Sequence, residues 1–86
     1  MHRFVVASSH TPARLIALCD SEGLFHVART ATGVPAVGTP LVGNGPQLGF
    51  GLLLGESFDT VYRVTFEAVR CDRDEAMQSL EWPLGR

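Results

Sequence analysis

Ser8, Ser9 and His10 place two hydroxyls beside an imidazole, and these residue types could support nucleophilic chemistry. A nucleophile and its base need a defined geometry and a third group that orients the base, and adjacency along the chain supplies neither. This polar run stands directly before Thr11 and Pro12, the sequence of a helix cap followed by its first residue. We therefore interpret residues 8–10 as a loop and predict no catalytic residues in it.

The candidate metal ligands are three histidines and two cysteines: His2, His10, His26, Cys19 and Cys71. Zinc sites usually contain a close pair such as Cys-x-x-Cys or His-x-x-x-His, and no such spacing occurs here. We predict no metal and no cofactor. His26 is expected on the surface of a sheet, and the cysteines are expected as reduced thiols that pack like small hydrophobic side chains.

Paired carboxylates could do acid–base work, as in Asp20 with Glu22 or Asp72 with Asp74 and Glu75. All of them fall at predicted turns or at the start of a predicted helix, where carboxylates stabilise local structure. The glycine-rich segment 43–49 matches neither a dinucleotide-binding nor a P-loop pattern, and the chain contains no lysine to reach a phosphate. These motifs predict turns and loops, and we expect no enzymatic activity.

Four segments are predicted as strands, at residues 3–8, 24–30, 47–54 and 60–69. The last is the clearest, because Tyr62, Val64 and Phe66 alternate with polar residues. Residues 55–59 supply the turn before it. A short edge strand is expected at residues 41–42, within a segment rich in glycine and proline.

Two helices are considered. Residues 72–82 are predicted as a helix, capped by Asp72 and Glu75 and ended by Pro83. Residues 11–23 are ambiguous. A helix is favoured there because the stretch lacks the alternation of a half-buried strand and has a helical apolar face ending at Gly23. The alternative is a hairpin of residues 13–20 and 24–30 around a glycine turn.

These elements predict one small domain of the α+β class, with a mostly antiparallel sheet of four or five strands and one or two helices. If residues 13–20 form a strand, the alternative is a small all-β barrel with a carboxy-terminal helix. The chain of 86 residues has room for a single thin core.

Charge and composition restrict the partners. The net charge is −2, and the seven basic residues are all arginines spread along the chain, so we expect no nucleic-acid-binding face. No apolar run is long enough to span a membrane. The first residues do not resemble an export signal, because polar residues and a proline interrupt them, and a cytoplasmic location is expected. Charged residues make up only 19% of the chain, which favours a buried contact surface.

The leading functional hypothesis is a non-enzymatic protein-interaction module whose partner is a second copy or another protein. Its expected surface combines Gly49 and Gly51, which leave bare backbone on one strand face, with Trp82 as a docking anchor. The alternative is a domain that binds a small ligand or nucleic acid through loop 31–47. The expected ligand contacts are then Arg29, Asn44 and Arg63.

Overall fold

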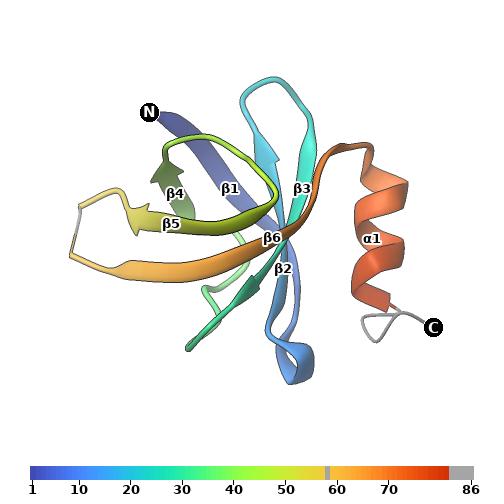
Figure 1. The fold of residues 1–86 in the computed structure, drawn as a ribbon, viewed down its shortest axis with the longest axis horizontal. Coiled ribbons are helices and arrows are strands. Elements are labelled where there is room, and N and C mark those ends of the chain that lie inside the picture. Colours follow the sequence, from blue (N-terminus) through green and yellow to red (C-terminus); the bar gives the residue numbers. More distant parts are fainter. Residues whose placement is uncertain (58, 82–86) are drawn as a thin grey trace.

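The computed structural model describes residues 1–57 and 59–81. In these residues six antiparallel strands close into a barrel in the order β1-β2-β3-β6-β5-β4, and one helix follows (Figure 1). This is the barrel alternative and not the open α+β sheet. The elements are β1 (His2–His10), β2 (Leu15–Asp20), β3 (Phe25–Thr30), β4 (Pro40–Gly43), β5 (Gly49–Gly55), β6 (Val61–Cys71) and α1 (Arg73–Glu81).

The favoured helix at residues 11–23 is wrong. The segment begins with a short 3-10 turn, Thr11–Ala13, and continues as strand β2, which forms a hairpin with β3 around Gly23. Alternation is missing because both faces of β2 are buried: Ile16 and Leu18 point into the barrel, and Leu15 and Ala17 lie under α1. A strand covered on both sides is continuously apolar, as in buried parallel sheets.

The barrel interior holds the main core. Its buried members come from all six strands and are Phe4, Val6, Ile16, Leu18, Ala28, Leu41, Leu53, Val64 and Phe66. Inward and outward residues alternate along the regular parts of the strands, as the period of a β-strand requires. The alternation predicted for the strand at residues 60–69 is confirmed from Arg63 to Phe66, since Val64 and Phe66 are buried and Arg63 and Thr65 are exposed. Beyond Phe66 the alternation breaks, because Ala68 packs outside the barrel.

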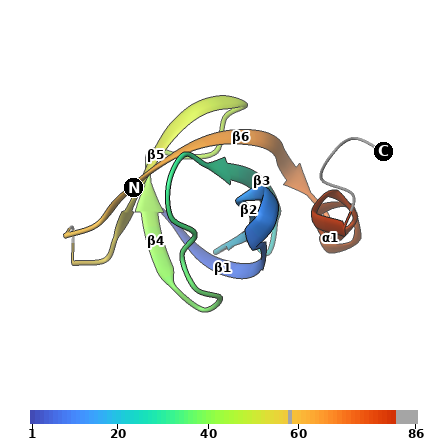
Figure 2. The same cartoon turned by 90° about the horizontal axis from the view of Figure 1, so that it is seen from below.

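A second, smaller core lies outside the barrel, where α1 covers β2 and β3 (Figure 2). Ala76 and Leu80 of α1 are buried there against Leu15, Ala17 and Val27. The predicted cap is confirmed: Asp72 accepts a hydrogen bond from the Glu75 N–H at 2.8 Å, and Glu75 accepts one from the Asp72 N–H at 3.0 Å.

Segment 31–39 crosses one end of the barrel (Figure 2). Its Ala31 N–H donates to the Arg63 carbonyl on β6, and its Gly38 N–H donates to the Val6 carbonyl on β1, each at 2.8 Å. Val34 packs against the interior core. Strand β4, expected at an edge, instead pairs with both β1 and β5, because the barrel closes through it.

Strand β6 is irregular near its end. Its register against β3 shifts twice, between Phe25 and Val27 and between Val27 and Ala28. Arg70 adopts a left-handed backbone with φ of 53°, which L-residues rarely occupy. Such bulges bend a strand, and here they turn the end of β6 toward α1. No helix within residues 1–57 and 59–81 is long and apolar enough to cross a membrane.

Candidate functional site

The most chemically distinctive group is a buried Asp–His pair. His26 Nε2 lies 2.8 Å from Asp20 Oδ2, and the His26 ring is fully buried against Phe4, whose ring lies edge-on at 5.7 Å. The N–H of Arg70 donates to His26 Nδ1 at 3.0 Å. Nδ1 therefore carries no proton, and Nε2–H is the donor to Asp20.

Asp20 is held ionised by its surroundings. Burial alone would raise its pKa, but the His26 hydrogen bond and the N–H groups of Leu24 and Glu22 together lower it below its ordinary value. A carboxylate that orients a histidine is part of many hydrolytic sites. In this protein both ring nitrogens are already occupied, so the pair has no free base to offer a substrate. It joins the β2–β3 turn to the bulge of β6.

The expectation that His26 lies on the sheet surface is wrong. His26 shares the inward face of β3 with Ala28. The sequence does not show which face of β3 is inward, because Phe25 and Val27 on the other face are also apolar and are covered by α1. A signal was present in the sequence. Asp20 begins the hairpin turn, and a carboxylate there stands near a histidine placed just after the turn.

The two cysteines are free and lie on either side of Phe25, Cys19 on β2 and Cys71 on β6. Two strand spacings separate their backbones by about 10 Å, too far for a disulfide. Burial, together with the nearby carboxylates of Glu75 and Asp72, raises the pKa of the Cys71 thiol. This thiol is a poor nucleophile near neutral pH.

The hydroxyl and imidazole groups of Ser8, Ser9 and His10 lie in β1, which continues to His10 where a loop was expected. Within the described part of the chain, no group of three or more histidine, cysteine or acidic side chains could hold a metal ion.

An apolar strip covers the outward face of β5 and the adjoining part of β6. Among the described residues it holds three of the seven large hydrophobic side chains that are exposed, Phe50 at 71%, Leu52 at 45% and Val61 at 53%. A fourth, Leu48 at 67%, directly precedes β5. Phe50 lies opposite Thr65, and Leu52 lies opposite Arg63. Val61 lies opposite Leu54 on the same sheet face, so three exposed hydrophobic side chains share one surface, which is uncommon on a protein without a partner.

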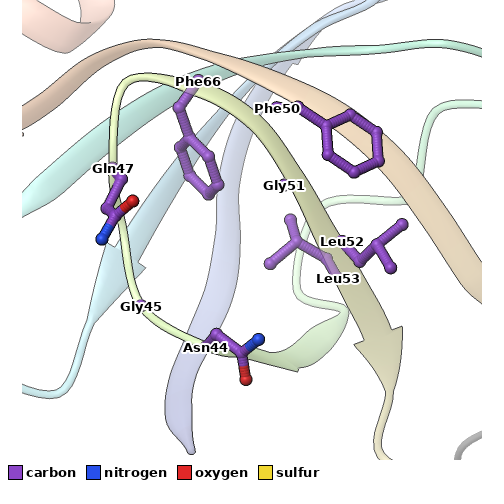
Figure 3. Close-up of a pocket in the computed structure, with 8 residues that line it drawn as sticks. All are labelled: Asn44, Gly45, Gln47, Phe50, Gly51, Leu52, Leu53 and Phe66. Atoms are coloured by element: carbon purple, nitrogen blue, oxygen red, sulfur yellow. The ribbon is translucent and has the colours of Figure 1, made fainter.

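A hollow of about 330 Å³ adjoins this strip (Figure 3). It lies between β5 and the arch, our name for residues 44–48 that connect β4 to β5. The Phe66 side chain lies within the loop of the arch, whereas Phe50 projects on the other side of β5 (Figure 3). The residues around the hollow are Asn44, Gly45 and Gln47 of the arch, Phe50, Gly51, Leu52 and Leu53 of β5, and Phe66 of β6.

The two glycines expected at an interaction surface have different settings. A Cβ on Gly51 would lie 2.9 Å from Phe66 Cε2. The Phe66 ring of the same chain therefore occupies the space beside Gly51. Gly49 has φ of 98° and no atom near its missing Cβ, so it is a conformational requirement at the end of the arch. The exposed apolar side chains of β5 point to the opposite face from Gly51. Trp82 lies outside the described residues.

The three expected ligand contacts are not gathered in one place. Arg29 is engaged by Glu67, with nitrogen–oxygen distances of 2.7 and 3.3 Å, and it also donates to the Ala13 carbonyl. Asn44 borders the hollow. Arg63 is exposed on the outward face of β6 beside the strip. Loop 31–47 divides into the end-covering segment 31–39, strand β4 and the arch.

Comparison of the chain with protein-family models, with curated proteins and with solved structures finds no match.

Proposed function

We propose that this chain is a non-enzymatic protein-interaction module that binds its partner through the apolar strip. The observation that carries the proposal is that Phe50, Leu52 and Val61 are exposed on one outward face, with the exposed Leu48 directly before it. Folding gains nothing from leaving this much apolar surface in water, whereas association removes it. Self-association is one form of such binding, and a twofold dimer is its simplest geometry.

The occupied Asp20–His26 pair supports the non-enzymatic part of the proposal, because both ring nitrogens of His26 are already hydrogen-bonded. Two of the seven arginines are already paired with carboxylates, which argues against nucleic acid as the partner. Arg29 is neutralised by Glu67, and Arg3 lies 3.1 Å from Glu56, so neither is available as a free phosphate contact.

A second candidate function is the binding of a small ligand. The hollow favours it, since its volume of about 330 Å³ is at the lower end of the range for small-molecule pockets. Its lining combines the amides of Asn44 and Gln47 with the apolar Leu53 and Phe66. No charged side chain lines the hollow among the residues described, so the ligand would be uncharged at that point.

The test compares Leu52→Asp with the matched control Val37→Asp, which places the same charge on an exposed apolar residue away from the strip. Each protein is immobilised and exposed to extract from the cells that make it, and self-association is measured by light scattering. We expect wild type and Val37→Asp to bind one partner protein or to form a dimer. Leu52→Asp should lose that binding. The same bound proteins and the same mass for all three would contradict the proposal.

A further inference from the structure

The strip and the hollow meet at an open strand edge. Strand β4 ends at Gly43, which lies opposite Leu53, whereas β5 continues along β6 to Gly49. From Leu52 to Gly49, β5 is therefore paired on one side only within the described structure. The arch swings away from this edge, and the hollow is the space that remains.

The backbone groups at this edge have a definite direction. The Gly55 N–H donates to the Thr60 carbonyl at 2.9 Å, so Gly55 points toward β6. In an antiparallel ladder the backbone N–H and C=O groups of successive residues point to opposite sides of the strand. Those of Leu53 and Gly51 therefore point toward β6, as at Gly55, and those of Phe50 and Leu52 point away from β6. A Cβ on Gly43 would lie 2.9 Å from the Leu52 carbonyl oxygen, which agrees with this direction. The N–H and C=O of Phe50 thus face the hollow.

The hollow has an aromatic floor. Phe66 is 3% exposed, and its ring edge lies beside Gly51 because that residue has no side chain. An aromatic side chain placed there would meet the Phe66 ring at an edge, which is a favourable geometry for two rings. The amides of Asn44 and Gln47 stand on the arch, where they can donate to or accept from a peptide group.

One charge lies next to this arrangement without an ion pair among the described residues. Arg63 is directly opposite Leu52, whose neighbours on β5 border the hollow. The other ion pairs of this side of the barrel are complete: Glu67 with Arg29 and Glu56 with Arg3. A partner segment that extends from the hollow across the outward face at Leu52 therefore reaches the unpaired guanidinium of Arg63. This favours a carboxylate on the partner.

We propose that the hollow receives an aromatic side chain from an extended segment of the partner protein. The backbone of that segment pairs with Phe50 at the open edge of β5. The carboxylate of the residue next to the aromatic one projects from the opposite face of the segment, as Arg63 does from the sheet, and pairs with Arg63. This inference rests on the proposed function and names the partner's chemistry. Addition of an extended segment to a free strand edge, with pockets for its side chains, is a recurrent mode of peptide recognition.

The test is a titration of the ¹⁵N-labelled chain with the blocked pentapeptide acetyl-Thr-Phe-Glu-Thr-Thr-amide, in which phenylalanine and glutamate project from opposite faces of an extended chain. Amide chemical shifts are followed by NMR. We expect saturable shifts centred on Gly45, Phe50 and Gly51. A peptide with alanine in place of phenylalanine should leave these amides unshifted. Replacing glutamate by glutamine should weaken binding by up to about fivefold, the range of an exposed ion pair.

Arg63→Ala should weaken the glutamate peptide by the same factor and leave the glutamine peptide unchanged. Arg73→Ala, an exposed arginine on α1, is the matched control and should change neither. The inference is overturned if the alanine peptide binds equally or if no peptide shifts these amides. It is also overturned if N-acetyl-phenylalanine amide binds as tightly as the pentapeptide, because the hollow would then be a small-ligand site. Each of these three outcomes leaves the loss of partner by Leu52→Asp as a separate result.

Discussion

Truncating Phe66 and Phe50 to alanine makes the same chemical change on the two faces of one sheet. Phe66 is buried in the barrel, where its ring lies 6.5 Å from that of Phe4, and Phe50 is 71% exposed. Removing a buried phenylalanine costs about 3–5 kcal/mol in unfolding free energy. The buried third of Phe50 corresponds to about 60 Å², or about 1.5 kcal/mol as an upper bound.

Denaturant unfolding of the two variants measures this difference directly. We expect Phe66→Ala to move the midpoint far more than Phe50→Ala, with Phe66→Ala removing a large share of the stability of so small a domain. Phe50→Ala should keep a wild-type fold and lose binding. Equal midpoints, or a larger loss for Phe50→Ala, would show that the faces of β5 and β6 are assigned the wrong way round.

Three further outcomes are expected. Asp20→Asn should lower the unfolding free energy by about 1–3 kcal/mol at neutral pH. Because the folded state lowers the pKa of Asp20, wild type loses its extra stability over Asp20→Asn as pH falls from about 4 through the folded pKa. The unfolding free energies of the two proteins should therefore converge in acid. A difference that persists or widens there would refute the role assigned to the Asp20 carboxylate. Gly51→Ala should destabilise by about 1–3 kcal/mol through the Phe66 ring, whereas Gly33→Ala, with open space around its Cβ, should be nearly neutral in the same melt. Thiol counting after unfolding without reductant should find both Cys19 and Cys71 free; finding neither would contradict the separation of their strands.

The sequence predicts those parts of the fold in which one face of a strand is exposed to solvent, or in which neighbouring residues cap a helix. Residues 60–69 alternate because one side of β6 faces solvent, and this alternation located both the strand and its buried face. A helix at residues 72–82 is predicted from Asp72 and Glu75, and these two residues exchange hydrogen bonds at the start of α1, Arg73–Glu81. Both signals come from residues close together in the chain.

The parts that could not be predicted depend on distant contacts. Strand β2 is covered by the barrel interior on one side and by α1 on the other, and the second cover comes from residues more than fifty positions later. The same cover hid the inward direction of His26. Barrel closure through β1 and β4 likewise turned a predicted edge strand into one paired on both sides.

The candidate site was located in part. The alternation of residues 47–54 placed Phe50, Leu52 and Leu54 on one face and the two glycines on the other. It could not show that the glycine face turns inward, because that depends on Phe66 filling the space beside Gly51. The glycine face was therefore expected at the interaction surface, and the exposed side-chain strip became visible only in the folded barrel.

Site-specific photo-cross-linking tests the central claim most directly. A photoreactive phenylalanine analogue is placed at Phe50 in one variant and at Val37, another exposed apolar residue, in the control. After irradiation of cells that make the protein, adducts are identified by mass spectrometry. Our account predicts one defined adduct, to a second copy or to another protein, from the variant at Phe50 and none from the control. No adduct at Phe50, or the same adducts at both positions, would contradict it.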